Sequence, residues 1–281
     1  MTRFGFAFNP TSEAALVARE RALAWSAAHD VAAWAAESGD TEALTAELRA
    51  GTDILVVLGG DGTFLRAARA VAAVDVPILG VNSGKVGFLS RAEGEQLEAC
   101  LGLVLEGAFE LEPRMVLQAQ VGPAAAGRAP GPAQVALNEA AIVRGSQARV
   151  VRLDVAIDSS HLATYTADGL IVATPTGSTG YAFSAGGPIL DPTSRNLVVV
   201  PVAAYLAGIR SVVVGPHHTV TVRVESAHDV LLSIDGHDDR PLAVGDQVRI
   251  RAHERPIHFV RPDGAADFWD LLRQKVELLP S

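Results

Sequence analysis

The pattern of apolar and polar positions divides the chain into two parts. In the first hundred residues, short apolar runs predict strands at 4–8, 31–36, 54–58 and 76–81. Between them, helical spacing predicts a helix capped by Thr11 or Ser12, a short helix over 41–49 and a helix after Thr63. Repeated strand–helix–strand units imply a parallel sheet with helices on both faces. We therefore expect an α/β domain over residues 1–108.

From about residue 110, short runs with strand composition recur between Gly, Pro and Asp turns. The predicted strands are 115–121, 150–157, 169–173, 212–214, 219–224, 230–234, 248–251 and 257–260. The Gly-, Ala- and Pro-rich segment 122–132 is interpreted as a hairpin loop. These runs predict an all-β domain over 109–264, built like a β-sandwich from two packed or curved sheets. The segment 265–281 contains a helical pattern and could pack back on the first domain.

Composition limits the functional classes. The chain has 281 residues and a net charge of −9, which argues against nucleic acid or an anionic membrane as the main partner. Cys100 is the only cysteine, so a disulfide framework is excluded, and the surrounding pattern predicts a buried thiol. The start of the sequence does not resemble a signal peptide, and the apolar stretch 197–209 is too short to span a bilayer. We expect a cytoplasmic protein.

Residues 59–63, with the sequence Gly-Gly-Asp-Gly-Thr, join a predicted buried strand to a predicted helix. Backbone N–H groups at such a helix start favour phosphate, and glycines allow close approach. Asp61 would repel phosphate unless it takes a proton or binds a metal, so the loop is suited to chemistry at a phosphate. A tight βα turn and a Rossmann loop are the alternatives. The sequence lacks the G-x-x-x-x-G-K-[ST] pattern of P-loop ATPases.

This loop resembles one shared by NAD kinases, by diacylglycerol and sphingosine kinases and, more loosely, by phosphofructokinases. Three further segments occur in order: 81–89, the pair Asn138-Glu139, and 168–188. Together the four segments closely resemble bacterial NAD kinase over nearly the whole chain. The resemblance implies an α/β first domain like that of phosphofructokinase and diacylglycerol kinase, followed by a β-rich NAD-binding domain. It also implies transfer of the ATP γ-phosphoryl group to the 2′-hydroxyl of the adenosine ribose of NAD, which makes NADP.

By this resemblance, Asp61 is the general base, and the loop residues Gly59, Gly60, Gly62 and Thr63 hold the phosphates of ATP. Mg²⁺ would arrive bound to ATP, because the sequence shows no protein metal cage. A homodimer or homotetramer is expected. The residues expected to bind NAD are Asp61, Gly62, Arg66, Phe88, Asn138, Glu139, Arg149, Thr166, Asp168, Thr179, Gly180, Tyr181, Ser184 and His237.

Several of these residues have plainer interpretations. Asn138 and Glu139 could form a strand-end turn, and Arg66 could be an exposed helix arginine. Phe88 could belong to the core, and His237 follows a plausible hairpin turn. Gly180 stands where alanine is common in the family.

Two other functions remain open. A lipid kinase could use the same glycine loop, although an acyl-chain cleft and a basic patch are not evident. A non-catalytic NAD(H) sensor is the second alternative, although a sensor has no need of Asp61. The sequence leaves open the choice of NAD or NADH, of ATP or polyphosphate, the number of subunits and control by NADPH.

Overall fold

The computed structural model describes residues 2–82, 87–122, 130–145, 149–205, 208–225 and 229–277, without the side chains of Asp238, Val276 and Glu277. Most of the predicted hairpin loop 122–132, and residues 83–86 of the segment 81–89, lie outside the described residues. The chain forms two compact units, Met1–Pro113 with Ile257–Ser281, and Arg114–Pro256.

The first unit is built on one seven-stranded sheet in the order β2-β1-β3-β4-β19-β6, with β5 paired to β4. The pairs of β1 with β2 and β3, and of β4 with β3, β5 and β19, are parallel. The strands are β1 (Arg3–Phe8), β2 (Ala32–Glu37), β3 (Ile54–Leu58), β4 (Ile78–Asn82), β5 (Ala92–Glu93), β6 (Phe109–Arg114) and β19 (Ile257–Pro262). The helices are α1 (Glu13–Ala28), α2 (Thr41–Arg49), α3 (Asp61–Val71), the 3₁₀ helix η1 (Gly94–Gln96), α4 (Leu97–Leu105) and α6 (Phe268–Glu277).

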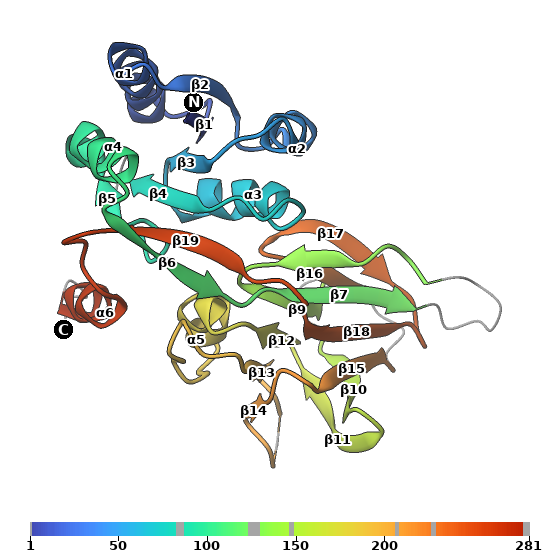
Figure 1. Ribbon diagram of the computed structural model, residues 1–281. Helices are drawn as coiled ribbons and strands as arrows, with labels where there is room; N and C mark the ends of the chain where they lie inside the picture. Colours follow the sequence, from blue (N-terminus) through green and yellow to red (C-terminus); the bar gives the residue numbers. More distant parts are fainter. Residues whose placement is uncertain are drawn as a thin grey trace. The chain divides into compact units, whose positions relative to one another are not determined.

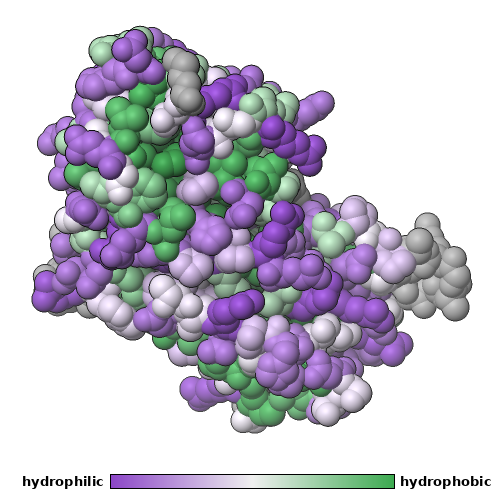
Figure 2. Space-filling view, in the orientation of Figure 1, coloured by the Kyte–Doolittle hydropathy of each residue, from purple (hydrophilic) through white to green (hydrophobic). Residues whose placement is uncertain are grey.

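Helices cover both faces of this sheet. Helix α1 packs with α4, and α2 packs with α3 (Figure 1). Ser12 caps α1, because its hydroxyl accepts the N–H of Ala15. Strands β3 and β4 are fully buried, which explains their almost continuous apolar sequence. In Figure 2, apolar residues show between polar ones on the visible face of this unit, as expected for alanine-rich helices such as α1.

The strand order places a topological switch point in the sheet. From β1 the chain moves to β2 on one side, whereas β3 lies on the other side of β1. Ligands of open α/β sheets bind beyond the carboxyl ends of the strands at such a point. The loop that leaves β3 is Gly59–Gly60, followed by Asp61 at the start of α3.

The second unit contains two six-stranded sheets. One has the order β11-β10-β15-β18-β7-β8, and the other has the order β14-β13-β12-β9-β16-β17. The strands of the first are β7 (Leu117–Gly122), β8 (Gln134–Ala136), β10 (Val151–Ile157), β11 (Ser160–Ala167), β15 (Thr219–Val224) and β18 (Gln247–Ala252). Those of the second are β9 (Glu139–Arg144), β12 (Gly169–Ala173), β13 (Leu197–Val202), β14 (Val212–Val214), β16 (Val230–Ile234) and β17 (His237–Leu242).

The two sheets share one apolar core, to which Leu153 and Val222 of the first sheet and Ile142 and Leu232 of the second contribute. Successive side chains of a strand alternate between faces, so Ala141 and Ile171 point to the outer face of the second sheet. The 3₁₀ helix η2 (Thr176–Thr179) and helix α5 (Tyr181–Ser184) lie against this outer face, where Ala182 is buried with Ile171. The sheet is therefore covered on both sides, which explains why β12 is buried at all five positions.

The predicted fold class is confirmed: an α/β first part with a parallel sheet, and an all-β second part of two packed sheets. Cys100 is buried as predicted, and burial raises the pKa of its thiol to about 11. One strand assignment was wrong. The run 257–260 was predicted for the β-rich segment, but β19 pairs with β4 in the first sheet. Its apolar sequence suits a strand of either unit, and only the pairing with β4 shows that it belongs to the first sheet.

Among the described residues, no helix has the length and apolar character needed to cross a membrane.

Candidate functional site

The glycine loop turns the chain sharply from β3 into α3. The N–H of Gly59 donates to the carbonyl of Val81 at the end of β4, which keeps the loop at the sheet edge. A Cβ at Gly59 would lie 2.6 Å from the hydroxyl oxygen of Thr63, so only glycine fits there. Gly60 is extended and serves as the N-cap residue of α3 without a side-chain cap. The N–H groups of Thr63 and Phe64 donate to the Gly60 carbonyl, which leaves those of Asp61 and Gly62 at the helix start for an anion, as the predicted phosphate role requires.

Asp61 is the first residue of α3, and its carboxylate is held by backbone groups of a distant segment. The N–H of Phe88 donates to Asp61 Oδ2 at 3.0 Å, and the N–H of Leu89 donates to Oδ1 at 3.2 Å. Gly87 makes this approach possible, since a Cβ there would lie 1.9 Å from Asp61 Oδ1. The carboxylate is half-buried, and each oxygen keeps a further lone pair for a ligand.

Two predicted neighbours of Asp61 differ in their surroundings. Arg66 is half-buried on the next turn of α3, with its guanidinium 3.3 Å from Ser38 Oγ and 3.5 Å from Thr63 Oγ1. It therefore lies over the start of α3 rather than extending into solvent. Phe88 packs its ring against Phe268 of α6, with ring centroids 6.3 Å apart. Gly62 is exposed on the first turn.

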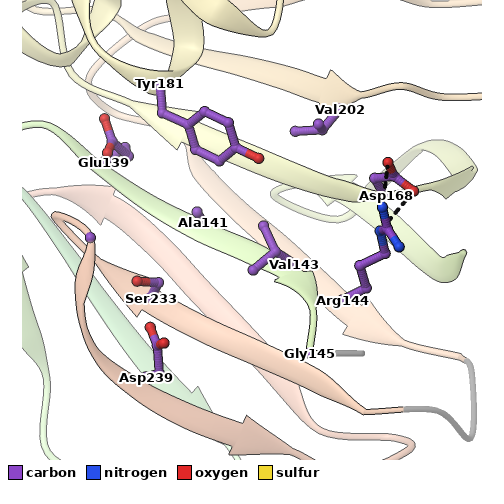
Figure 3. Close-up of a pocket in the computed structure, with 11 residues that line it drawn as sticks. Glu139, Ala141, Val143, Arg144, Gly145, Asp168, Tyr181, Val202, Ser233 and Asp239 are labelled. Atoms are coloured by element: carbon purple, nitrogen blue, oxygen red, sulfur yellow. Dashed lines mark hydrogen bonds and ion pairs between the residues drawn. The ribbon is translucent and has the colours of Figure 1, made fainter. Parts of the chain in front are cut away.

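The second unit has a pocket of about 480 Å³ on the outer face of its β9-containing sheet (Figure 3). Its floor is formed by outward-facing residues of β9 and β16, where Ala141 stands opposite Ser233 in the register. Small side chains at both positions leave the space open. Tyr181 of α5 projects across the pocket with its hydroxyl toward the end occupied by Asp168 (Figure 3). A volume of this size suits a nucleoside-sized ligand.

Asn138 and Glu139 form the turn into β9 at one end of the pocket. Glu139 is 7% exposed, and its Oε2 has no hydrogen-bond partner in the structure. The side-chain oxygen of Asn138 is likewise buried without a partner. Gly180 adjoins both, because an added Cβ would lie 3.3 Å from Glu139 Oε2 and 3.5 Å from Asn138 Nδ2. Buried polar atoms without partners are uncommon, and a ligand with hydroxyl or amino groups would satisfy these.

Asp235 holds this turn in place. One of its carboxylate oxygens accepts the N–H groups of Asn138 and Glu139 at 2.8 and 3.0 Å, and the other accepts the N–H of Leu137 at 2.9 Å. Asp235 is 4% exposed and has a φ of +51° in the hairpin between β16 and β17. The sequence predicted a hairpin turn here, which the structure has. It did not predict that the turn carboxylate supports Asn138 and Glu139.

The Glu139 carboxyl has an altered acidity. Burial, and secondarily the negative charge of Asp235, raise its pKa to about 8. At neutral pH its protonated form is therefore favoured, and a protonated carboxyl can donate as well as accept a hydrogen bond.

Asp168 lies at the other end of the pocket and is paired with Arg144, which sequence reasoning missed. The guanidinium meets the carboxylate in two contacts, Nε to Oδ1 at 3.0 Å and Nη2 to Oδ2 at 3.2 Å (Figure 3). Both residues also line the pocket. Asp239 of β17 also lines the pocket and was not predicted from the sequence (Figure 3). Neither Arg144 nor Asp239 belongs to a recognisable sequence motif, so the sequence alone gave no reason to place them at the site.

The segment 174–181 is fixed by close backbone contacts. Gly177 leaves no room for a side chain, since a Cβ would lie 2.1 Å from the carbonyl oxygen of Asn138. The hydroxyl of Thr174 donates to Leu137 O at 2.5 Å and accepts the N–H of Gly177 at 3.1 Å. The Thr179 hydroxyl donates to the carbonyl of Thr176. The segment therefore packs directly on the Asn138–Glu139 turn.

The structure brings some predicted NAD residues together and leaves others apart from the pocket. Glu139, Asp168 and Tyr181 line it, and Asn138 and Gly180 adjoin Glu139. Thr179, two residues before Tyr181 in the chain, is half-buried. Four further predicted residues of the second unit do not line the pocket: Arg149, exposed before β10; Thr166 on β11; Ser184, exposed at the end of α5; and His237, whose ring nitrogen Nδ1 lies 2.6 Å from Gly236 O.

Comparisons with known proteins identify the family. Residues 5–109 match the family model of the ATP-NAD kinase N-terminal domain, and residues 137–262 match that of the C-terminal domain. The chain is 45% identical over 225 residues to the NAD kinase of Symbiobacterium thermophilum, covering 80% of this chain and 78% of that one. It is 35% identical over 280 residues to the NAD kinase of Chloroflexus aurantiacus, covering 97% of each.

Two solved structures have a similar fold. The NAD kinase of Archaeoglobus fulgidus in complex with ATP superposes with a TM-score of 0.78 at 26% identity, covering 99% of this chain and all of that one. A yeast NADH kinase complexed with NADH gives 0.86 at 23% identity, covering 99% and 87%, and supports the fold alone. The matches in sequence and in structure confirm the predicted family: the chain belongs to the ATP-NAD kinase family of ATP-dependent kinases.

Proposed function

We propose that the chain transfers the γ-phosphoryl group of ATP to the 2′-hydroxyl of the adenosine ribose of NAD, with Asp61 as the general base. The observation that carries the proposal is the carboxylate of Asp61 at the amino end of α3, directly after a phosphate-suited glycine loop. The two backbone N–H groups that hold it fix its position but leave lone pairs for a substrate hydroxyl.

In this reaction the 2′-oxygen forms a bond to the γ-phosphorus while the bond from that phosphorus to the bridging oxygen of ADP breaks. Asp61 accepts the proton of the 2′-hydroxyl, which makes the oxygen a better nucleophile. Positioned general bases contribute about 10²–10⁴ in rate. The N–H groups of the first turn of α3, together with Arg66, are suited to the negative phosphate oxygens.

Mg²⁺ is part of the proposal as an ion carried by ATP. The described residues include no group of three or more His, Cys, Asp or Glu side chains that could hold a metal ion. Asp61 carries the one carboxylate of the glycine loop 59–63. Mg²⁺ is commonly bound by one or two carboxylates together with substrate phosphates. The ion would supply charge neutralisation on the phosphate oxygens.

The pocket of the second unit is proposed to bind NAD. Its polar atoms without partners, Asn138 Oδ1 and Glu139 Oε2, suit the hydroxyl and amino groups of a nucleoside. Tyr181 is 41% exposed, and its ring offers a face for stacking. Occupation of the pocket by NAD is supported by the membership of the chain in the ATP-NAD kinase family, and ATP as donor by the archaeal neighbour, an NAD kinase in complex with ATP. Association into a homodimer or homotetramer belongs to the same proposal and is tested by light scattering.

The test is a coupled assay with NAD, ATP and Mg²⁺, in which an NADP-specific dehydrogenase reports the product. We expect steady NADP formation that EDTA abolishes. Asp61→Asn should lower kcat by about 10²–10⁴ while NAD binding measured by calorimetry persists. The matched control is Glu42→Gln, an exposed carboxylate on α2 of the same unit, which should leave kcat unchanged. Unchanged turnover in a folded Asp61→Asn protein would exclude Asp61 as the base. Replacing ATP by polyphosphate, or NAD by NADH, then defines the substrates.

A further inference from the structure

Phe88 connects the C-terminal helix to Asp61. Its backbone N–H donates to Asp61 Oδ2 at 3.0 Å. Its ring contacts two residues of α6: the ring of Phe268, with centroids 6.3 Å apart and an angle of 40°, and the ammonium of Lys275, which lies 4.2 Å from the Phe88 centroid. The same residue thus meets the proposed base with its main chain and α6 with its side chain.

The contacts of Phe88 fix its orientation. Aromatic pairs and cation–π contacts have preferred geometries, so two partners on one helix constrain where the ring can lie. Phe268 is itself 8% exposed and anchors the start of α6, whereas Lys275 lies two turns further along the helix. Since Gly87 and Leu89 flank Phe88 and also adjoin Asp61, a shift of the ring displaces the N–H groups that hold the carboxylate.

We propose that α6 is a positioning element for Asp61, acting through Phe88, in the reaction proposed above. This role does not require any described residue of α6 to contact the substrate. Its effect is on the placement of the base, so the helix should influence kcat more than the KM for NAD or ATP. Displacement of a reacting group by about 1 Å can cost about 10² in rate, which sets the upper end of the expected effect.

The central variant is Lys275→Met, which keeps the length of the side chain and removes the cation. We expect kcat to fall about three- to tenfold with both KM values unchanged, and Lys275→Arg to restore it, because a guanidinium also binds an aromatic face. Phe268→Leu should lower kcat by about 10–100-fold. The matched control is Arg273→Met on the same helix, because the Arg273 side chain is 67% exposed and paired with Asp270. It should leave kcat unchanged.

A double-mutant cycle separates positioning from a general structural effect. If α6 acts through Asp61, Lys275→Met has no further effect on kcat in the Asp61→Asn background. If it acts only on stability, the fall in kcat is the same in both backgrounds, and the proposal is overturned. Hydrogen exchange gives an independent readout, since the amides of Phe88 and Leu89 should exchange faster in Lys275→Met than in Arg273→Met. Equal exchange would also overturn the proposal.

The two proposals fail separately. If the wild-type protein makes no NADP, the proposed function fails, whereas the exchange of the Phe88 and Leu89 amides still reports whether α6 holds this segment. If the wild type is active and Asp61→Asn is not, but Lys275→Met has full activity, only the role of α6 is excluded.

Discussion

Removal of the Asp235 carboxylate should weaken both the β-rich unit and its affinity for NAD. Asp235 accepts three backbone N–H groups, those of Leu137, Asn138 and Glu139, from a segment 96–98 residues earlier in the chain. In Asp235→Ala all three donors lose their acceptor in a site where the aspartate is 4% exposed. The turn that carries Asn138 and Glu139 would then keep the bond from the Thr174 hydroxyl to Leu137 O but lose the carboxylate that its three N–H groups share.

The magnitude follows from these bonds. A hydrogen bond to a charged group contributes about 1.5–3 kcal/mol, so three would sum to about 5–9 kcal/mol if nothing relaxed. Water can reach part of an opened turn, and single substitutions seldom exceed about 5 kcal/mol. The positive φ of Asp235 adds about 1 kcal/mol against alanine. We therefore expect Asp235→Ala to lower the free energy of unfolding by about 4–5 kcal/mol.

Asp235→Asn separates the hydrogen bonds from the backbone effect, because asparagine tolerates positive φ. Its amide oxygen can keep the bonds to Asn138 and Glu139, but its amide nitrogen then faces the N–H of Leu137. The bond to Leu137 is lost, two donors oppose each other, and the two remaining bonds are no longer made to a charged group, so the free energy of unfolding should fall by about 2–3 kcal/mol.

The assays are urea unfolding and NAD calorimetry under conditions where each variant is folded. We expect Asp235→Asn to bind NAD at least about tenfold more weakly, which corresponds to about 1.4 kcal/mol. The control is Asp246→Asn on another turn of the same unit, where the carboxylate accepts the N–H of Ala243 at 2.9 Å. It should affect stability by about 1 kcal/mol and leave NAD affinity unchanged. If Asp235→Ala changed stability by less than about 0.5 kcal/mol, the role assigned to this carboxylate would be refuted.

Two further predictions concern Glu139 and Gly87. Because the pKa of Glu139 is raised from 4.5 to about 8, the folded unit holds a proton that the unfolded chain releases, so its stabilising contribution is full below pH 4.5 and is lost as the pH rises to about 8. Glu139→Gln should flatten that decline in urea unfolding curves measured across this range, and an unchanged slope would contradict the assignment. Gly87→Ala places a Cβ 1.9 Å from Asp61 Oδ1 and should lower kcat by about 10². Gly102→Ala on α4, where nothing lies within 4 Å of an added Cβ, should leave kcat unchanged, and equal kcat values for the two variants would refute the crowding argument.

The features that could be predicted from the sequence are local. The strand at 54–58, the glycines after it and Asp61 are contiguous, so the strand–turn–helix geometry and its suitability for phosphate follow from one short segment. Ser12 as the cap of α1 and the hairpin at Asp235-Gly236 are equally local. In each case the residues that determine the structure are neighbours in the chain.

The features that were missed depend on pairing over long distances. β19 has an apolar sequence suited to either unit, and only its register with β4 assigns it to the first sheet. Strands β9 and β13 were not among the predicted strands, although residues of both line the pocket. Arg144 and Asp168 meet because β9 and β12 are antiparallel neighbours, with Val143 opposite Gly169. A single sequence does not display such a register.

Asp61 and Asp235 show how one structural arrangement can serve two purposes. Both carboxylates accept backbone N–H groups from segments far away in the chain, 27–28 residues for Asp61 and 96–98 for Asp235. Asp235 accepts three such groups and is almost fully buried, so its carboxylate supports the turn. Asp61 accepts two and is half-buried, so it is held in place but can still meet a substrate hydroxyl. The difference in exposure is therefore consistent with the proposal that Asp61, and not the better-bonded Asp235, meets the substrate.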